Sequence, residues 1–475
     1  MNDTGTSNTL QRNLRELSEK HKLSPALADH LERYFADIDA DNFLDVNLEE
    51  LHGAAIQHNR LGQSRPAGQA AIALYTPDFD RHGWHSPHTV IDIVTDDMPF
   101  LVDSVTMVVY NRGLAIHRLI HPVLGIERDA AGLLCRSAER GTAGTHGESW
   151  IHLEIDRIGD SAVLDELRTE IADVLADIRA AVADFAEMRQ RVETAIGGLG
   201  GAKSADSEEI VDFLRWAASE NFIFLGYAHY QTGADAASLA RAPDGGLGLL
   251  RRADHPRFGH CRTGMPSRIA ELQALPSALT LTKADARSIV HRSGYLDYIG
   301  VRERDAKGAV VGEHVFVGLY AAHVYHISTT EIPVVRRKVA AVRTACGFAP
   351  GGHNDKTLRN ILETYPRDEL IEIDTADLQR IAHGIVMLHE HQRVRVFLRD
   401  DRWCRYVSAL VYTPRDRFDT TVRLRIMALL SNTLGADSVD FFINVDESRL
   451  ARLHLIARTP DGTCYQYDAE AIERD

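Results

Sequence analysis

The sequence predicts a multidomain α+β protein, and three observations support this fold class. The chain has 475 residues, which exceeds the usual size of a domain with a single hydrophobic core, so we expect roughly three domains. Short apolar runs typical of strands alternate with stretches in which apolar residues recur every three or four positions, as on an amphipathic helix. Hydrophobic residues make up 44% and charged residues 25% of the chain, which is ordinary for a globular protein.

Charge and the lack of targeting signals narrow the class of protein. The chain has 53 Lys and Arg residues and 68 Asp and Glu residues, which gives a formal net charge of -15. This acidic balance argues against nucleic acids and anionic membranes as partners, because both bind to basic surfaces. No apolar run approaches the ~20 residues that span a bilayer, and the first residues lack the pattern of a signal peptide. The five cysteines are scattered, which argues against a disulfide framework or a cysteine-based zinc site. We therefore expect a cytoplasmic protein with no nucleic acid and no membrane as partner.

Periodicity and composition divide the chain into six segments. The first segment is predicted to be helical, with Ser24 as cap and Pro25 at the first helical position. The other boundaries are placed where the pattern changes: two mixed α/β regions, a long amphipathic helix with a glycine-rich linker between them, then a purely helical stretch and a final α/β region. The last residues of the chain predict the start of a further helix that is truncated. The segments are 1–60 (helical), 61–160 (first α/β domain), 161–204 (long helix and linker), 205–330 (second α/β domain), 331–391 (helical connector) and 392–475 (third α/β domain).

The most informative segment runs from Val94 to Ile116. An apolar strand ends at an acidic turn, a helix-period run follows, and Gly113 leads into a second apolar strand. This order is typical of small-molecule-sensing ACT modules, whose ligands lie where the strand meets the helix. N–H groups at a helix N-terminus bind anions, and carboxylates accept hydrogen bonds from an ammonium group; alternatively, one aspartate caps the helix and the other is solvated. The candidate effector-binding residues are Asp96, Asp97, Met98, Pro99, Phe100, Leu101 and Asp103.

The final region, from residue 392 onward, repeats this order of strand, turn and helix. The strand Val407–Pro414 and the helical pattern over 419–434 correspond to the strand Val90–Val94 and the helical pattern over 99–111. Sequence identity between the two regions is faint. We therefore predict a repeat of topology and a second ACT-like domain at residues 392–475.

Three further local predictions concern other parts of the chain. The alternation of apolar and polar residues over 150–156 predicts a half-buried strand, and the apolar spacing over 164–192 predicts one long helix. Thr330 is placed to cap a new helix that has Pro333 in its first turn.

Two histidine-rich segments offer nitrogen ligands for a metal ion. The histidines within 82–88 lie in a Gly/Pro-rich loop without fixed geometry. His323 and His326, with His314 nearby, lie on a strand-like run, where positions three apart point to opposite faces. We therefore expect packed or exposed histidines and no metal site. The glycine-rich stretches match no phosphate-binding fingerprint, and the common hydrolase and metalloprotease motifs are absent from the sequence.

A series of sequence blocks occurs together in an order that resembles one family, the large bacterial NAD-specific glutamate dehydrogenases. The combination is far more specific than any single block, and it covers nearly the whole chain. The blocks are DDMPFLVDSV (96–105), GLAIHRLIHPVLGI (113–126), ESWIHLEID (148–156), FLGY (224–227), LTKADARSIVHR (281–292), YLDYIGV (295–301), EIPVVRRKVAAV (331–342), LETYPRDEL (362–370) and TPRDRFDTTVRLRI (413–426).

The resemblance implies an N-terminal region with ACT-like domains of ferredoxin-like βαββαβ order, a PAS-like domain at 205–330 and helical connectors. The family enzyme converts L-glutamate, NAD and water into 2-oxoglutarate, ammonium and NADH. That chemistry needs a dinucleotide fold and a lysine-bearing glutamate pocket. The sequence contains no Rossmann fingerprint, so we assign no catalytic residue, expect no cofactor in this fragment and expect NAD only in the full-length enzyme.

The resemblance also implies partners and regulation. The expected partners are the protein's own catalytic domain, further copies of the chain in a homo-oligomer built through the ACT-like domains, and an amino-acid effector that regulates glutamate catabolism allosterically. Many amino-acid-binding ACT modules have a glycine after the turn proline, where this chain has Phe100, whose ring can fill the pocket. The alternative function is a purely structural assembly module without effector binding. A third hypothesis is an independent metal enzyme that uses the histidine clusters.

Overall fold

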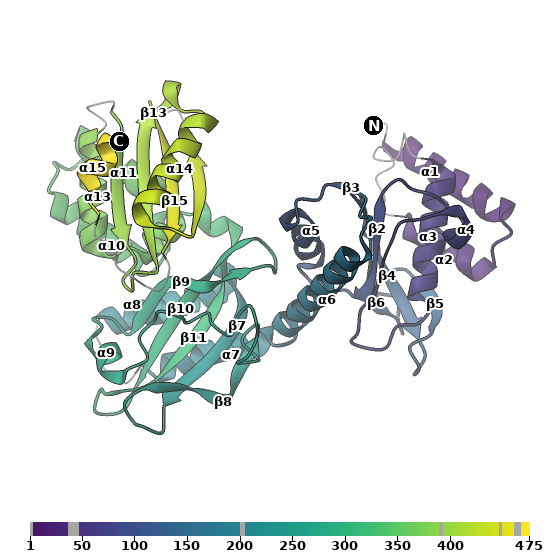
Figure 1. The fold of residues 1–475 in the computed structure, drawn as a ribbon. Coiled ribbons are helices and arrows are strands. Elements are labelled where there is room, and N and C mark those ends of the chain that lie inside the picture. The colour runs from purple at the N-terminus through teal and green to yellow at the C-terminus, as the bar shows by residue number, and fades with distance from the viewer. Residues whose placement is uncertain (1–2, 37–46, 200–204, 389–392, 446–448, 460–466) are drawn as a thin grey trace. The chain divides into compact units, whose positions relative to one another are not determined.

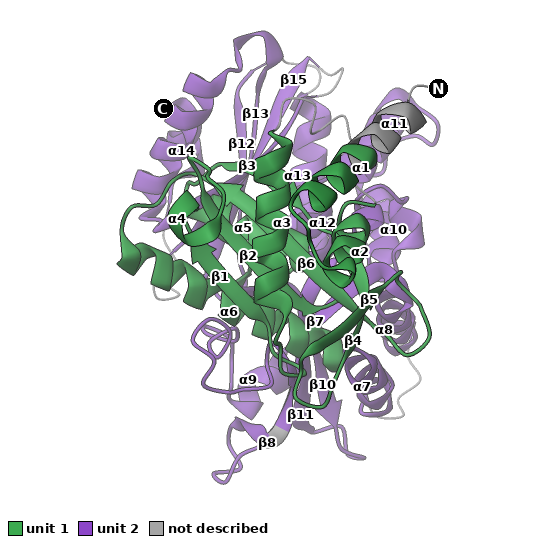
Figure 2. Ribbon diagram, turned by 90° about the vertical axis from the view of Figure 1, so that its right-hand side faces the viewer, with its two compact units in different colours: residues 1–183, 287–294 green, residues 184–286, 295–475 purple. Residues whose placement is uncertain are grey.

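A computed structural model describes residues 3–36, 47–199, 205–388, 393–445, 449–459 and 467–475 (Figure 1). The chain forms two compact units (Figure 2). Unit 1 comprises residues 1–183 with 287–294, and unit 2 comprises residues 184–286 with 295–475. Within the described ranges, no helix combines the length and the apolar character needed to cross a bilayer.

Unit 1 begins with helices, as predicted. They are α1 (Asp3–Lys20), α2 (Pro25–Tyr34) and α3 (Leu48–Gly62). Ser24 caps α2, since its side-chain oxygen accepts a hydrogen bond from the backbone N–H of Leu27 at 3.3 Å. Leu31, Tyr34 and Phe35 are buried and form the apolar side of this helical region.

The helices of unit 1 are followed by an antiparallel sheet with the order β1-β2-β6-β4-β5, in which β3 also pairs with β6. Both β3 and β4 pair with the long strand β6: β3 pairs with its C-terminal half and β4 with its N-terminal half. The elements are β1 (Ala71–Tyr75), α4 (Phe79–His82), β2 (Thr89–Asp96), α5 (Leu101–Asn111), β3 (Ile116–Ile120), β4 (Val123–Arg128), β5 (Leu134–Ala138), β6 (His146–Ile155) and α6 (Ser161–Ala183).

Unit 2 opens with two helices and a five-stranded antiparallel sheet of order β8-β7-β11-β10-β9. Alternate residues of its central strands pack on the helices, and aromatic side chains such as Phe224 and Phe316 fill this core. The elements are α7 (Phe185–Gly197), α8 (Ala205–Trp216), β7 (Phe222–Thr232), β8 (Leu239–Gly248), α9 (Ile269–Ala274), β9 (Leu279–Ser288), β10 (Gly294–Arg304) and β11 (Val310–Tyr320).

The second half of unit 2 consists of a helical stretch and a four-stranded antiparallel sheet of order β12-β13-β15-β14. The helix α14 ends at Gly435, which adopts the left-handed conformation with a φ of 57° that glycine permits. The elements are α10 (Val335–Cys346), α11 (His353–Thr364), α12 (Arg367–Glu372), α13 (Thr375–Leu388), β12 (Arg395–Asp400), β13 (Tyr406–Pro414), α14 (Thr420–Leu434), β14 (Ser438–Asn444), β15 (Leu450–Arg458) and α15 (Ala469–Arg474).

The first and last sheets share one topology, as the repeated sequence pattern predicts. In each, an edge strand pairs with the strand that precedes the helix, and the last strand lies next to that strand: β1-β2-β6-β3 corresponds to β12-β13-β15-β14. The predicted βαββαβ order is nevertheless wrong. The edge strands β1 and β12 precede their partners in the chain, so the last region runs ββαββα. The first region follows the same order with two additions, the short helix α4 after β1 and the paired strands β4 and β5 before β6.

Three local predictions need correction. The long helix over 164–192 is two helices, α6 and α7, which are separated at Asp184. Thr330 lies within a short 3-10 turn that Ser328 caps, and α10 begins only at Val335. The histidine segment after β11 is not a strand, because Ala322–Tyr325 forms another 3-10 turn.

The strand β6 is buried on both faces, although its alternating pattern predicts a half-buried strand. His152 and Glu154 are 1% and 2% exposed. Charged neighbours make this burial tolerable: Asp92 Oδ1 lies 2.6 Å from His152 Nδ1, while Ser86 and Arg118 donate hydrogen bonds to Glu154. The polar face of β6 is therefore a hydrogen-bonded interior layer.

The cysteines are not all free thiols. Cys135, Cys261 and Cys346 are free, but Cys404 is disulfide-bonded. A single bridge is compatible with the prediction, which was directed against a disulfide framework and a cysteine-based zinc site.

Candidate functional site

The acidic turn that the sequence singles out lies at the end of β2 in unit 1, and both of its adjacent aspartates have arginine partners. Asp96 accepts hydrogen bonds from Arg65 at 2.7 Å and from Arg179. Asp97 accepts one from Arg140 at 2.7 Å. Burial alone would raise the pKa of Asp96, but the two arginine hydrogen bonds outweigh it and hold that pKa below its ordinary value. Both carboxylates are thus engaged within the chain.

Phe100 shapes the entrance to α5. It has a φ of 73°, the left-handed conformation that glycine adopts most easily, and its ring packs on His291 with 5.0 Å between the ring centroids. The His291 backbone N–H donates to Ser104 Oγ at 3.0 Å, and that hydroxyl donates to the carbonyl oxygen of Phe100 at 2.6 Å. Residues 287–294 therefore cover the first turn of α5 within unit 1.

The remaining predicted residues of the turn differ in their surroundings. Leu101 is buried, Met98 is half-buried and Pro99 is exposed. Asp103 is exposed, and its carboxylate lies 3.5 Å from His291 Nδ1. The structure thus gathers the predicted residues at one turn, where the chain's own side chains pack against it.

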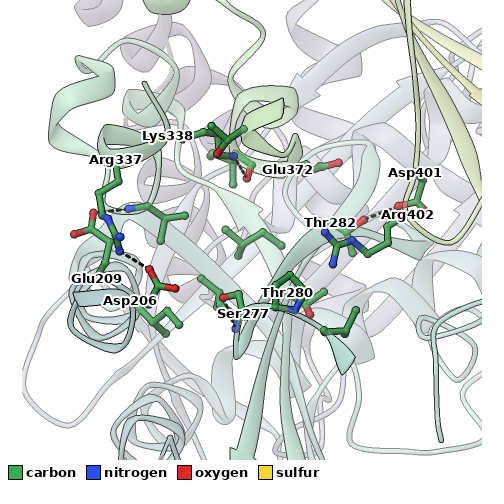
Figure 3. Close-up of a pocket in the computed structure, with 18 of the residues that line it drawn as sticks. Asp206, Glu209, Ser277, Thr280, Thr282, Arg337, Lys338, Glu372, Asp401 and Arg402 are labelled. Atoms are coloured by element: carbon green, nitrogen blue, oxygen red, sulfur yellow. Dashed lines mark hydrogen bonds and ion pairs between the residues drawn. The ribbon is translucent and has the colours of Figure 1, made fainter. Parts of the chain in front are cut away.

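A cavity of about 660 Å³ lies within unit 2, where the five-stranded sheet, the helical stretch and the β12–β13 turn meet (Figure 3). Small-molecule sites typically measure ~300–1,000 Å³. The walls combine apolar side chains with charges of both signs. The charged lining residues are Asp206, Glu209, Arg302, Arg337, Lys338, Glu372, Arg399, Asp401 and Arg402, and the hydroxyl-bearing ones are Ser277, Thr280, Thr282, Thr375 and Tyr406.

Arg302 is a buried cation of the cavity wall that uses only part of its hydrogen-bonding capacity. It lies on β10 and is 1% exposed; one terminal nitrogen donates to Thr280 Oγ1 at 3.0 Å. Its Nε has no hydrogen-bond partner among the residues that the structure describes. Burial lowers the pKa of Arg302 to about 10, against the opposing charge of Glu313, so the group is cationic at neutral pH. A buried cation with an unused donor at a cavity is suited to bind an anion.

The carboxyl group of Glu372, which lines the same cavity, changes its charge near neutral pH. Tyr406 donates a hydrogen bond to its Oε2 at 2.5 Å, whereas its Oε1 has no hydrogen-bond partner in the described ranges and lies 3.9 Å from Lys283 Nζ. Burial raises the pKa of Glu372 to about 7, although Lys283 and Arg399 favour the charged form. Its charge will therefore respond to a charged ligand near neutral pH.

The two lysines near this cavity hold the fold together. Lys338 Nζ donates to the carbonyl oxygens of Leu370 at 2.9 Å and Ile373 at 2.5 Å, and so caps the C-terminal end of α12. Burial lowers the pKa of Lys338 to about 8. Lys283 Nζ pairs with Asp297 at 2.5 Å. Both ammonium groups are used within the protein.

Sequence reasoning did not identify the cavity, because its walls come from elements spread between Asp206 and Tyr406. The available signal was indirect. The blocks at 281–292 and 331–342 that carry the family resemblance contain Thr282, Arg337 and Lys338 of the cavity wall.

Comparison with known protein families matches three stretches of the chain. Residues 30–171 match the glutamate dehydrogenase ACT1 domain, residues 332–391 match the glutamate dehydrogenase helical motif 1, and residues 395–475 match the glutamate dehydrogenase ACT2 domain. The two ACT matches contain the first sheet, β1 to β6, and the last sheet, β12 to β15.

Full-length relatives support the same family. The NAD-specific glutamate dehydrogenase of Halomonas elongata is 36% identical over 450 residues, which are 93% of this chain and 28% of that protein. The Pseudomonas aeruginosa enzyme of the same name is 34% identical over 96% of this chain and 29% of its own length. The Mycobacterium tuberculosis enzyme is 31% identical over 85% of this chain and 24% of its own length.

The fold and the cavity define a multidomain α+β protein with a charged, small-molecule-sized site. The chain belongs to the NAD-specific glutamate dehydrogenase family and carries its ACT1, helical motif 1 and ACT2 domains. It spans 28% of the length of the Halomonas elongata relative. Among solved structures, histidine kinase ThkA in complex with response regulator protein TrrA is 12% identical over 49% of this chain and 96% of its own, with a TM-score of 0.14, which is too low to support an argument.

Proposed function

We propose that this chain is the N-terminal regulatory and assembly region of an NAD-dependent glutamate dehydrogenase, separate from the catalytic core. The observation that carries the proposal is that almost the whole chain matches about a quarter of each relative's length, through ACT and helical-motif domains. The full-length enzyme would oxidise L-glutamate to 2-oxoglutarate and ammonium with NAD. The test is an assay of this chain for glutamate-dependent NAD reduction. We expect none, and measurable turnover would place the active site within these 475 residues.

Our domain assignment keeps the six segments predicted from the sequence, with an ACT-like domain at 61–160 and another at 392–475. The five-stranded antiparallel sheet with its flanking helices supports a PAS-like domain at 205–330. The helices within 331–391 then act as the connector between this domain and the last sheet. We also propose a cytoplasmic location for the full-length enzyme.

We further propose that the effector site of this region is the charged cavity of unit 2. The Nε of Arg302 is placed to donate to the carboxylate of a small amino acid, while Glu372 can accept a hydrogen bond from its ammonium group. Apolar lining residues such as Ile210 and Leu281 leave room for a short side chain. An α-amino acid is therefore the ligand class that matches the charges of both signs.

We propose that the turn at residues 96–103 responds to binding of the effector in the cavity. The strand β9 carries Thr280 and Thr282 of the cavity wall, and its continuation, residues 287–294, covers the first turn of α5 in unit 1. A ligand that shifts β9 would thus alter the contact between His291 and Phe100. A direct effector site at the turn remains the second candidate, and it requires release of residues 287–294 and exchange of the arginine partners of Asp96 and Asp97. Allosteric coupling of this kind is typically worth ~1–3 kcal/mol.

Calorimetry with single-residue variants distinguishes the two positions. L-glutamate, L-aspartate and L-arginine are each titrated into the unmodified chain, into Arg302→Met and into Asp97→Asn. We expect binding heat that Arg302→Met abolishes and Asp97→Asn preserves, with an affinity that rises between pH 6 and pH 8 as Glu372 ionises. Loss of heat only in Asp97→Asn would move the site to the turn. No heat with any amino acid would leave the structural assembly module as the function.

The assembly part of the proposal involves the last sheet. The strand β14 lies at the edge of that sheet and has exposed apolar side chains at consecutive positions, Phe441, Phe442 and Ile443. Exposed apolar edge strands readily pair with another chain. We propose that a second copy of this chain pairs there, so that the enzyme assembles through its ACT-like sheets.

A further inference from the structure

Three side chains from three neighbouring strands of unit 2 converge on one face of the five-stranded sheet. His229 lies on β7, His314 on β11 and Glu303 on β10, and β11 runs between the other two strands. His314 is the direct cross-strand partner of His229. Glu303 is paired with Gly312, two positions before His314, so its side chain lies diagonally beside His314 on the same face.

The spacing of the three groups suits a metal ion. Glu303 Oε2 lies 3.1 Å from His229 Nε2 and 3.9 Å from His314 Nε2, and one ligand atom from each residue lies within 4.8 Å of the others. Two ligands on a tetrahedral zinc ion with bonds of ~2.0–2.1 Å are ~3.3 Å apart. Small side-chain adjustments therefore place an ion between the three groups.

The surroundings orient one of these ligands and leave room for the cluster. Tyr227 Oη lies 2.8 Å from His314 Nδ1, and when that nitrogen donates its proton to the hydroxyl, Nε2 presents its lone pair to the cluster. Gly312 keeps the centre open, because a Cβ there would lie 2.6 Å from Glu303 Oε2 and 3.3 Å from His229 Nε2.

The cluster borders a cavity of about 580 Å³, which all three residues line. Three protein ligands with one open position are typical of zinc sites that bind a further molecule, whereas purely structural zinc sites are closed by four ligands. Arg191 also lines this cavity, and its charge is partly offset by Glu187, whose Oε1 lies 2.6 Å from Arg191 Nη2. A nearby guanidinium favours an anionic molecule in the open position.

A second group of similar composition consists of His58, Asp92 and His152 in unit 1. His58 bonds through its two ring nitrogens to Tyr34 at 2.9 Å and to the Ile93 carbonyl at 3.2 Å. Asp92 lies 2.6 Å from His152 Nδ1. His152 Nε2 has no hydrogen-bond partner in the described ranges, but neither ring nitrogen of His58 is available to a metal ion, so this group carries no metal proposal.

We propose that His229, Glu303 and His314 form a binding site for a divalent transition-metal ion, with Zn²⁺ as the first candidate, and that its open coordination position faces the cavity. The site is independent of the effector cavity, whose lining residues are all different. It gives the central sheet of unit 2 a ligand-binding role of its own.

The experiment uses the 475-residue chain after removal of metals with a chelator. Zn²⁺ is titrated by calorimetry, and Co²⁺ serves as a spectroscopic probe of coordination geometry. We expect about one tight equivalent of Zn²⁺ per chain, visible absorption typical of tetrahedral Co²⁺, and a higher melting temperature of unit 2 when Zn²⁺ is bound. The double variant His229→Ala/His314→Ala should lose ~100-fold or more in Zn²⁺ affinity.

Two further variants keep the result interpretable if the double variant folds poorly. Glu303→Gln preserves the shape of the side chain and should weaken Zn²⁺ binding, because the amide carries no charge. His323→Ala/His326→Ala removes two histidines of unit 2 that lie outside the cluster and should bind Zn²⁺ like the unmodified chain. Zn²⁺ affinity that is the same in Glu303→Gln and in the unmodified chain, or absence of a tight equivalent in the unmodified chain, would overturn the proposal.

Discussion

At the scale of single residues, the decisive feature of this protein is the number of charged side chains that are buried with partners. In unit 1, Arg65 joins Asp96 to Glu148, with 2.7 Å to each carboxylate, and its side chain is 4% exposed. A buried ion pair adds little net stability over an apolar pair, but removal of one member leaves the other charge without compensation. Such residues are therefore sensitive points of the fold even without a catalytic role.

This argument gives a first prediction. Arg65→Met should lower the free energy of unfolding of unit 1 by about 1–3 kcal/mol, because the buried Glu148 loses one of its two arginine partners and keeps only Arg128. Denaturant unfolding measures the change. The matched control is Arg136→Met, whose pair with Glu127 is 3.0 Å long and about half exposed, and it should cost less than ~1 kcal/mol. Equal costs for the two variants would show that Arg65 is not a buried link.

At the scale of elements, the turn before α5 has a backbone conformation that glycine favours, although a phenylalanine occupies the position. Phe100 stands at the entrance to α5 with a positive φ, which costs a residue with a side chain roughly 1–2 kcal/mol relative to glycine. The contact of its ring with His291 offsets part of that cost. The turn geometry is thus retained, and the ring lies where a smaller residue would leave space.

The second prediction tests this conformation. Both Phe100→Gly and Phe100→Ala lose the contact with His291, but only glycine relieves the backbone. Phe100→Gly should therefore be more stable than Phe100→Ala by about 1 kcal/mol, measured by denaturant unfolding of unit 1. An alanine variant as stable as the glycine variant would contradict the positive φ.

The third prediction concerns the edge strand β14. Its side chains Phe442 and Ile443 are 57% and 45% exposed, so a lysine at either position should keep the fold and oppose pairing with a second chain. We expect the unmodified chain to form at least a dimer in light scattering and Ile443→Lys to be monomeric. Leu133→Lys, at a site that is 49% exposed in unit 1, is the control and should assemble normally. A monomeric unmodified chain would exclude assembly through β14.

At the scale of the whole molecule, the buried histidines set a pH range for stability. Burial lowers the pKa of His30 to about 3 and that of His58 to about 4. The unfolded chain then takes up protons first as the pH falls through 6.5, so folding stability falls with it. His152 behaves in the opposite way. Burial opposes its charge, but Asp92 outweighs this and raises its pKa to about 9, so its contribution is complete below pH 6.5 and is lost as the pH rises through 9.

The fourth prediction follows from these opposite signs. The melting temperature of unit 1 should be highest near neutral pH and fall on both sides. At pH 5 the cost should be about 2 kcal/mol for each of His30 and His58. Calorimetric melting between pH 5 and pH 9 measures the decrease in melting temperature on both sides of neutral pH. The control variant His117→Gln, which removes a partly exposed histidine, should show both decreases. A stability that stays flat down to pH 5 would contradict neutral, buried His30 and His58.

Local patterns predicted most of the elements. The cap formed by Ser24, the strand–turn–helix order at 94–116, the glycine end of α14 and the repeated topology all depend on neighbours in sequence, which is why they could be recognised. The errors arose where longer-range packing intervened. The helical period continues through Asp184, yet the helix divides there, and the carboxylate of Asp184 binds the backbone N–H of Gly248 at 2.7 Å.

The sequence by itself therefore determined the α+β class, the family and the location of the ACT-like turn, because each rests on local order or on blocks read along the chain. Only the tertiary structure decided which charges are buried. Arg302 and Glu372 meet at one cavity although they are 70 positions apart in the chain, and His229 contacts Glu303, which is 74 positions away. Strand register and packing bring such residues together, and no periodic pattern in the sequence indicates that residues so far apart in the chain are close in space.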